Sequence, residues 1–263
     1  MTIPARKFHR FVVLGDSYSE GMTDEVVNGK YRGWADRVAD TLAKADPSFT
    51  YANLAIRGKL VSQVVADQIP EAIPLITGSD TLVSFHAGAN DALRPGYKPE
   101  VAQEIYAQAV RRAAASGATI MLFTVLERTG NTGRGSDVWA ARFGEFNKIV
   151  RKVGAEVGAI VNDANNESFF SDNRFLAFDR LHLNAEGHNR VAQALLEKLE
   201  YQFDPSWRIP LPPAQPTPWI KKRLIAAIWF FTFALPWIWR RLRGKSSGDG
   251  RVAKYPTPTS WPV

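Results

Sequence analysis

The stretch Phe11-Val-Val-Leu-Gly-Asp-Ser-Tyr-Ser-Glu-Gly21 sets a short apolar run directly in front of a glycine, a carboxylate and a serine. Four apolar residues ended by a glycine are typical of a buried strand. The core of a secretory leader needs about 7–15 apolar residues, so this run is too short for one, and we expect a cytoplasmic protein. The stretch therefore predicts a first central strand with Asp16 and Ser17 at its carboxyl end.

Strand and helix signals alternate along the chain after this run. Further short apolar runs predict strands at Phe49–Leu54, Thr81–Phe85, Thr119–Val125 and Ala159–Val161. Apolar residues at helical spacing predict helices at Trp34–Ala45, Val61–Ile69, Pro99–Ser116, Val138–Val153 and Ala185–Glu200. Strands that alternate with helices form a parallel sheet covered on both faces. We therefore expect residues 1–203 to form a three-layer α/β/α domain with a five-stranded parallel sheet.

Chemically capable residues follow these strands instead of preceding them. Ser17 comes directly after the first strand, Gly58 lies in the loop after the second, and Asn90 follows the third. Asp179 and His182 lie in the last loop before the final helix. The carboxyl ends of parallel strands meet at one edge of the sheet, where ligands of such folds bind. All five residues are therefore expected at the same edge.

These residue types suit acyl transfer. A serine hydroxyl becomes a nucleophile when a base takes its proton, and histidine is the side chain best suited to do so near neutral pH. A carboxylate fixes the imidazole tautomer and stabilises the imidazolium. Asp179 lies three residues before His182, so one loop presents both. The backbone N–H groups of Ser17 and Gly58 and the side-chain amide of Asn90 are candidate donors to an oxyanion.

Each segment has a second interpretation when it is taken alone. Glycine followed by aspartate and serine is a common turn composition, Gly58 also suits an ordinary turn, and the loop with His182 also suits the surface. His86, at the end of the third strand, is either a core residue or part of a substrate pocket. The four segments together, in this order and at strand ends, favour a catalytic site.

The four segments are similar to the motifs of the SGNH hydrolase superfamily, also called the GDSL esterases and lipases. The segments that carry the similarity are Gly15-Asp-Ser-Tyr-Ser-Glu-Gly21, Asn53-Leu-Ala-Ile-Arg-Gly58, Gly88-Ala-Asn-Asp91 and Asp179-Arg-Leu-His-Leu-Asn184. The resemblance spans roughly residues 8–200. Tyr18 stands where the family's name has leucine and Ala89 where a second glycine is frequent, and neither departure removes a catalytic group.

The resemblance implies a flavodoxin-like fold and a serine esterase activity. It implies Ser17 as the nucleophile, His182 as the general base and Asp179 as the acid that orients the base. It also implies an oxyanion hole made by the N–H groups of Ser17 and Gly58 and by the side chain of Asn90. No metal and no organic cofactor are implied.

Three functions remain open for such residues. A serine hydrolase would pass the acyl group of a small ester, thioester or O-acyl compound to water through an acyl-serine intermediate. An acyltransferase would use the same residues and an alcohol as the acceptor. The third function is that of a catalytically silent module, tethered to a membrane, that binds carbohydrate or lipid.

Composition and charge exclude other classes of protein. A chain of 263 residues with 45% apolar and 22% charged residues suits a globular protein and excludes a disordered or polytopic membrane chain. Cysteine is absent, which excludes disulfides and thiolate zinc sites. The net charge of +7 belongs to the part from residue 204 onward, which has 10 Lys and Arg against 2 Asp and Glu. The rest has no excess of positive charge, so we expect no binding of nucleic acid.

After residue 203 the sequence changes character, and residues 204–219 are rich in proline, which predicts an extended linker. Residues 220–243 hold the apolar run Leu224–Trp239 between clusters of Lys and Arg. As one helix the run would extend about 24 Å, short of the roughly 30 Å of a bilayer core, so we expect a monotopic anchor on an anionic, inner membrane surface. The alternative is an arm that docks on the body or on a partner subunit. Residues 244–263 are polar and are expected to be disordered.

Overall fold

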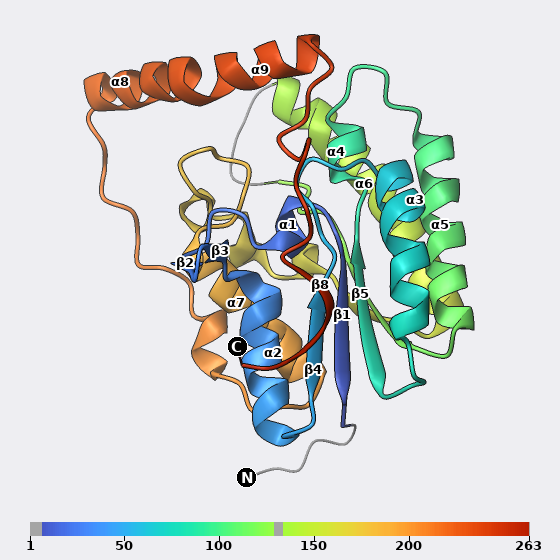
Figure 1. The fold of residues 1–263 in the computed structure, drawn as a ribbon. Helices are drawn as coiled ribbons and strands as arrows, with labels where there is room; N and C mark the ends of the chain where they lie inside the picture. The colour runs from blue at the N-terminus through green and yellow to red at the C-terminus, as the bar shows by residue number, and fades with distance from the viewer. Residues whose placement is uncertain (1–6, 129–133, 263) are drawn as a thin grey trace.

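The fold is organised around one six-stranded sheet, in a computed structural model that describes residues 7–128 and 134–262. The strands are β1 (Arg10–Gly15), β4 (Thr50–Asn53), β5 (Thr81–His86), β6 (Thr119–Phe123), β7 (Ile160–Asn162) and β8 (Tyr255–Ser260). Their order across the sheet is β7-β6-β5-β1-β4-β8. The first five strands of this order run parallel, and β8 runs antiparallel to β4. The predicted five-stranded parallel sheet is confirmed, with a further strand at its edge (Figure 1).

Two helical layers cover the faces of this sheet (Figure 1). The first layer consists of α2 (Gly33–Ala45) and α7 (Ala185–Lys198), which share one apolar core with the sheet. The second layer consists of α3 (Val61–Ala72), α5 (Pro99–Ala115) and α6 (Arg134–Val157), which share the other core. The predicted α/β/α arrangement is therefore confirmed.

The two cores explain why the first strand is apolar throughout. Phe11 and Val13 point into the core under α2 and α7. Val12 and Leu14 point into the core under α3, α5 and α6. Successive side chains of a strand point to opposite faces, so a strand between two helical layers needs apolar residues at every position. The chain reaches the carboxyl edge of the sheet where this run ends, at Gly15.

Short elements gather around that edge and connect the main layers. They are α1 (Ser17–Glu20), the hairpin of β2 (Val26–Val27) and β3 (Lys30–Tyr31), α4 (Ala89–Ala92), η2 (Ala164–Asn166), η3 (Ser168–Ser171) and η4 (Asn173–Phe175). The short η1 (Ile73–Leu75) lies at the opposite edge, where Arg10 at the start of β1 donates to the carbonyl oxygen of Leu75. Helix α1 starts two residues after β1, and α4 starts three residues after β5. The residues that follow the central strands are thus held in short helices at one edge of the sheet.

The first part of the expected linker packs on the domain. The short helix η5 (Pro205–Arg208) places Trp207 in the core beside α7. The guanidinium Nη1 of Arg190 donates hydrogen bonds to the carbonyl oxygens of Trp207 (3.1 Å) and Ile209 (2.6 Å). The chain therefore stays attached to α7 for several residues beyond position 203.

A long helical segment then crosses the top of the molecule (Figure 1). It consists of α8 (Trp219–Trp229), the π-helical η6 (Phe230–Ala234) and α9 (Leu235–Leu242), and we call it the C-terminal helix. Most of its side chains are exposed, and Trp229, Phe233 and Trp237 are partly buried at helical spacing. Among the described helices, none is long and apolar enough to cross a membrane.

Residues 244–263 differ from the disordered tail that we expected, because the part described up to residue 262 returns to the sheet. Lys254 is buried, and its Nζ donates to Asp36 Oδ2 at 2.7 Å. The indole Nε1 of Trp261 donates to Asp40 Oδ1 at 2.8 Å. The polar composition concealed this structure because the partners of the segment lie on α2 and β4, about 200 residues away in sequence. We call residues 244–262 the C-terminal strap.

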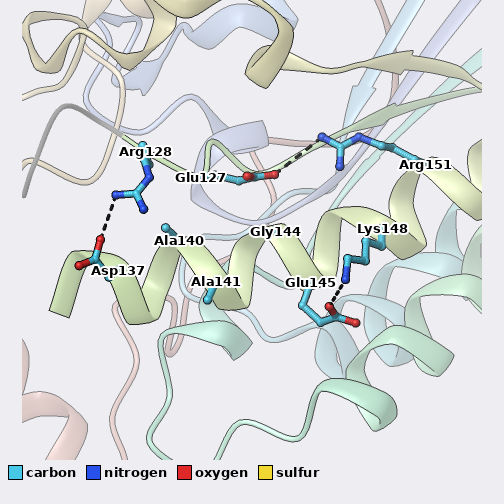
Figure 2. Close-up of a pocket in the computed structure, with 9 residues that line it drawn as sticks. All are labelled: Glu127, Arg128, Asp137, Ala140, Ala141, Gly144, Glu145, Lys148 and Arg151. Atoms are coloured by element: carbon cyan, nitrogen blue, oxygen red, sulfur yellow. Dashed lines mark hydrogen bonds and ion pairs between the residues drawn. The ribbon is translucent and has the colours of Figure 1, made fainter. Parts of the chain in front are cut away.

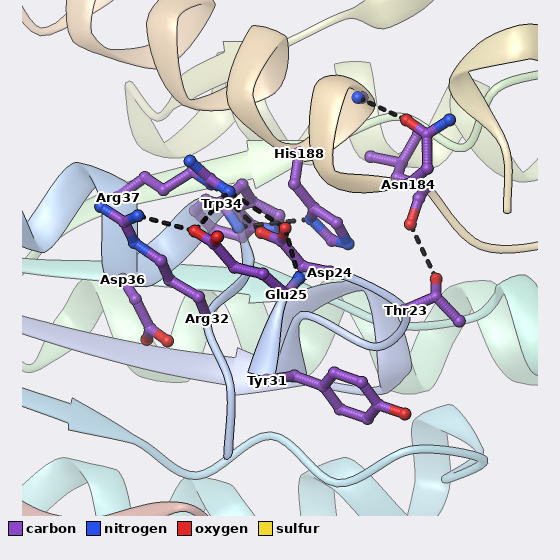
Figure 3. Close-up of polar contacts among 12 residues, drawn as sticks. Thr23, Asp24, Glu25, Tyr31, Arg32, Trp34, Asp36, Arg37, Asn184 and His188 are labelled. Atoms are coloured by element: carbon purple, nitrogen blue, oxygen red, sulfur yellow. Dashed lines mark hydrogen bonds and ion pairs between the residues drawn. The ribbon is translucent and has the colours of Figure 1, made fainter. Parts of the chain in front are cut away.

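A buried histidine joins α7 to the start of α2 (Figure 3). His188 Nδ1 accepts from the backbone N–H of Trp34 (3.3 Å), and Nε2 lies 3.1 Å from the carbonyl oxygen of Met22. The proton therefore resides on Nε2, and the ring is neutral. Burial lowers the pKa of His188 to about 4, although the nearby Asp24 acts in the opposite direction and Arg37 acts in the same direction as burial.

This depressed pKa makes the fold sensitive to acid. Between pH 6.5 and 4, His188 is protonated in the unfolded chain but neutral in the folded chain. The free energy of unfolding therefore falls as the pH falls through this window, by about 2–3 kcal/mol. His188→Gln keeps an acceptor and a donor but does not titrate. We expect urea unfolding at several pH values to show a flatter dependence in this window for the variant. Equal slopes for both proteins would contradict the assignment.

Candidate active site

Ser17 opens α1 directly beyond the carboxyl end of β1. The strand end is held by Gln68, whose Oε1 accepts from the Gly15 N–H (2.8 Å) and whose Nε2 donates to the Gly15 carbonyl (2.9 Å). Position 15 has a φ of +144°, and a Cβ there would lie 2.3 Å from the carbonyl oxygen of His86. Only glycine fits this close approach, so the turn that presents the serine is fixed by packing on β5.

His182 lies between Ser17 and Asp179. Its Nε2 is 2.9 Å from Ser17 Oγ, and its Nδ1 is 2.7 Å from Asp179 Oδ2. A carboxylate only accepts hydrogen bonds, so Nδ1 carries the proton and Nε2 is free to accept from the serine hydroxyl. The fold thus brings together, as an unbroken chain of hydrogen bonds, three residues that the sequence separates by up to 165 positions.

The loop that carries Asp179 and His182 is ordered by its own backbone. Asp179 Oδ1 accepts from the N–H groups of Leu181 (2.9 Å) and His182 (3.0 Å). Asn184 caps α7 by accepting from Gly187 N–H at 3.0 Å, which fixes the end of the loop. Burial acts to raise the pKa of Asp179, but the hydrogen bonds and charge of His182 outweigh it and hold that pKa below its ordinary value. The carboxyl group is therefore ionised at neutral pH.

The turn that contains Gly58 lies beside this chain of hydrogen bonds. Gly58 has a φ of +74°, a left-handed conformation that favours glycine. Asn90 Nδ2 donates to Asp16 Oδ2 (3.0 Å) and to the carbonyl oxygen of Lys59 (3.1 Å). Asn90 therefore joins the residue before Ser17 to the Gly58 turn. Both of its amide hydrogens are engaged, so donation to a substrate requires it to exchange one of these partners.

An ion pair that we did not predict ties the Gly58 turn to α1. Glu20 Oε2 accepts from the backbone N–H of Arg57 at 2.7 Å, and its carboxylate pairs with the Arg57 guanidinium. The N–H of Ile56 donates to the carbonyl of Gly15 at 3.1 Å. Glu20 and Arg57 both lie within the segments that carry the resemblance. Their opposite charges were the signal in the sequence from which this ion pair could have been predicted. The turn is thus bonded to both ends of the strand-to-helix junction.

The C-terminal helix also contacts the loop that carries Asp179 and His182, so the alternative of an arm that touches the body describes part of it, although no local signal indicated the partner residues. Trp229 Nε1 donates to the backbone carbonyl of Asp179 at 3.1 Å. The guanidinium of Arg180 lies 4.7 Å from the centre of the Trp229 ring. The exposed Phe178 and Leu181 flank the same loop. The loop that presents His182 is therefore partly covered by the C-terminal helix.

Two other polar residues at this edge, His86 and Asp91, pack against or bond to neighbouring parts of the fold. His86 is buried, with its ring centre 4.5 Å from that of Tyr18 and its Nδ1 3.4 Å from Asp16 Oδ1. Asp91 Oδ2 accepts from the N–H of Val61 at 2.9 Å, at the start of α3. Burial raises the pKa of Asp91 to about 6. The structure favours the core interpretation of His86 over the pocket interpretation.

A polar pocket of about 490 Å³ lies apart from these residues (Figure 2). Its charged groups pair with one another: Arg128 with Asp137 (3.0 Å), Lys148 with Glu145 (2.6 Å) and Arg151 with Glu127 (3.7 Å). Neither Ser17 nor His182 lines it. Within residues 7–128 and 134–262, no three His, Asp or Glu side chains form a group suited to a metal ion.

The chain is similar to known proteins in both sequence and fold. The profile of the GDSL-like lipase/acylhydrolase family matches residues 13–190. An α/β hydrolase, LAE5, from the metagenome of Lake Arreo superposes with a TM-score of 0.62 at 20% identity, over 76% of this chain and 98% of that one. The acetylxylan esterase Axe2 from Geobacillus stearothermophilus gives a TM-score of 0.61 at 17% identity, over 77% and 98%. No curated protein sequence gives a significant match.

The α/β/α fold and its motifs define a hydrolase of the SGNH type. Because the family profile covers more than half of the sequence, the chain belongs to the GDSL-like lipase/acylhydrolase family, and it is a carboxylic ester hydrolase.

The contact between Asp179 and His182 predicts a large effect of Asp179→Asn. An amide at this position no longer favours the Nδ1–H tautomer or a positive imidazole, so we expect kcat to fall by about 10³–10⁴ with little change in stability. The measurement is hydrolysis of p-nitrophenyl acetate together with thermal unfolding. Asp172→Asn, which loses a surface ion pair with Arg174, is the matched control. A similar loss of rate in both variants would contradict a special role for Asp179.

Proposed function

We propose that Ser17 is the nucleophile, His182 the general base and Asp179 the orienting acid of an esterase that works through an acyl-serine intermediate. The observation that carries this proposal is the chain of hydrogen bonds from Asp179 through His182 to Ser17, at 2.7 and 2.9 Å. A base within hydrogen-bond distance of a hydroxyl, and itself oriented by a third group, is the arrangement that nucleophilic catalysis requires.

The reaction has two steps in this proposal. Ser17 Oγ attacks the carbonyl carbon of the ester while His182 Nε2 takes the hydroxyl proton. The tetrahedral intermediate then collapses, the bond to the leaving alkoxide breaks, and His182 returns the proton to that oxygen. In the second step a water molecule attacks the acyl carbon while His182 Nε2 takes its proton. The bond between the acyl carbon and Ser17 Oγ then breaks, His182 returns the proton to Oγ, and the acid leaves. Asp179 stays ionised throughout and stabilises the imidazolium.

We propose the N–H groups of Ser17 and Gly58 and the side chain of Asn90 as donors to the oxyanion. The bonds of the Gly58 turn to Gly15, to Glu20 and to Asn90 support this, because they place the turn beside the serine. Asn90 would release Lys59 or Asp16 when the oxyanion forms. The two backbone N–H groups need no such exchange, and donors that are fixed before the reaction cost no reorganisation at the transition state.

We propose a small ester, thioester or O-acyl compound as the substrate. Ser17 is buried, and Trp229 is bonded to the loop that presents His182, which supports a small acyl group. The similar acetylxylan esterase, whose name describes removal of acetyl groups, supports the same class. Transfer to an alcohol instead of water uses the same residues and is separated from hydrolysis by its products.

Ser17→Ala tests the nucleophile directly. The variant removes one oxygen atom, and we expect kcat for p-nitrophenyl acetate to fall by at least 10³ while the protein remains folded. Ser19→Ala, a buried serine two residues away, is the matched control and is expected to keep most of the activity. Equal rates for Ser17→Ala and the wild type would sink the proposal. Added glycerol that captures most of the acetyl group would identify a transferase instead.

We also propose that the C-terminal helix docks the enzyme on an anionic membrane surface on the cytoplasmic side. Eleven of its large apolar side chains are exposed: Trp219, Ile220, Leu224, Ile225, Ile228, Phe230, Phe231, Leu235, Ile238, Trp239 and Leu242. Basic residues lie at both ends of the helix, and no Asp or Glu occurs between positions 205 and 248. An apolar helix with basic ends suits the boundary between acyl chains and anionic headgroups.

Flotation with liposomes tests this docking. We expect the wild type to float with vesicles that contain phosphatidylglycerol and to remain behind with neutral phosphatidylcholine vesicles. Leu224→Asp combined with Phe231→Asp should weaken binding at least 30-fold, because two apolar side chains no longer enter the acyl-chain region of the membrane. Val101→Asp, at an exposed position on α5, is the control. A wild-type protein that floats with neither kind of vesicle would exclude the proposal. Substitutions are needed because truncation would also remove the C-terminal strap.

A further inference from the structure

The C-terminal strap crosses directly over the Gly58 turn after it leaves the C-terminal helix. Ser246 Oγ donates to the carbonyl oxygen of Gly58 at 3.2 Å. The same hydroxyl accepts from the N–H of Gly248 at 3.3 Å, and Asp249 Oδ2 accepts from the N–H of Ser246 at 2.8 Å. The strap therefore forms a tight turn of its own here, and a single hydroxyl connects the two turns.

The two turns touch through their glycines. A Cβ on Gly248 would lie 2.0 Å from the carbonyl oxygen of Arg57. A Cβ on Gly58 would lie 2.2 Å from Ser246 Oγ. Both distances are far below van der Waals contact. Gly248 is required by the backbone of Arg57 that faces it, and Gly58 faces the Ser246 hydroxyl in a left-handed conformation that itself favours glycine. Such an approach specifies the relative position of the two turns closely.

The Gly58 turn is thereby held from both sides. On its inner side it is bonded to Gly15, to Glu20 and to Asn90, which belong to the junction that presents Ser17. On its outer side it is bonded to Ser246.

The strap itself is firmly attached further along the chain. Lys254 Nζ donates to Asp36 and to the carbonyl oxygens of Tyr31 (2.9 Å) and Arg32 (3.2 Å). Strand β8 pairs with β4, and the Trp261 ring lies 4.9 Å from that of Tyr51. A support that is anchored in this way resists displacement of the turn that it covers.

We propose that Ser246 and Gly248 are positioning residues of the catalytic site: they hold the Gly58 turn so that its N–H meets the oxyanion of the transition state. This inference rests on the proposed role of Gly58 as an oxyanion donor. Neither residue touches the substrate, and both act through Gly58. The C-terminal strap, which lies outside the region 13–190 matched by the family, is then a working part of the enzyme.

Substitutions at the contact test this role through the division between kcat and KM. Ser246→Ala removes one hydrogen bond, and we expect kcat for p-nitrophenyl acetate to fall about threefold to tenfold while KM stays within twofold. Gly248→Ala forces the Gly58 turn to move, and kcat should fall at least tenfold. Ser246→Thr keeps the hydroxyl and should restore kcat to within twofold of the wild type. Ser260→Ala, at an exposed position further along the strap, is the matched control.

A second measurement is independent of activity. Hydrogen exchange followed by mass spectrometry should show faster exchange of the peptide around Gly58 in Ser246→Ala than in Ser260→Ala, at equal melting temperature. Unchanged kcat and exchange in both Ser246→Ala and Gly248→Ala would overturn the inference. Loss of kcat that Ser246→Thr does not restore would overturn it as well. A wild type without turnover dependent on Ser17 would refute the proposed reaction instead, and the exchange data would still decide whether the strap holds the turn.

Discussion

The arrangement at the carboxyl edge of the sheet depends on one hydrogen bond, between Ser17 Oγ and His182 Nε2. The proposed transfer of the serine proton to the imidazole needs these two atoms about 3 Å apart. A small displacement of either residue would therefore prevent the transfer. The two residues are 165 positions apart, with Ser17 at the start of α1 and His182 in the loop before α7. Gln68 holds the strand end before the serine, and Asp179 holds the histidine. The core places the segments near each other, and buried polar contacts set the final distance.

Asp16 has a central place among these contacts although it precedes the serine and does not join the chain of hydrogen bonds. One of its carboxylate oxygens accepts from the N–H of Tyr18 and so caps α1, and the other accepts from Asn90. Asn90 in turn contacts the carbonyl of Lys59. A single buried carboxylate therefore connects the helix that carries the serine with the turn that carries Gly58. Such a connection fixes the position of α1 relative to the Gly58 turn.

The sequence predicted the parts of the structure that are encoded locally. The apolar run before Gly15 predicted the central strand, and the position of polar residues after the strands predicted which of them meet. The sequence did not predict β8, because Tyr255–Ser260 contains two prolines and its pairing partner lies some 200 positions earlier. It did not predict that Asn90 would be fully engaged, because spacing along a chain says nothing about which acceptor an amide finds. Contacts of Trp229 and Lys254 were missed for the same reason: their partners are distant in sequence.

The strand β8 has a consequence for the behaviour of the protein in a crowded solution. Without it, β4 would be an open edge, whose free N–H and C=O groups could recruit a strand from another molecule. With it, the outermost strand contains Pro256 and Pro258, which lack N–H groups and so make a poor template for further pairing. The last residues of the chain thus protect the sheet from self-association. A protein shortened at this end is expected to precipitate even where its catalytic residues are intact.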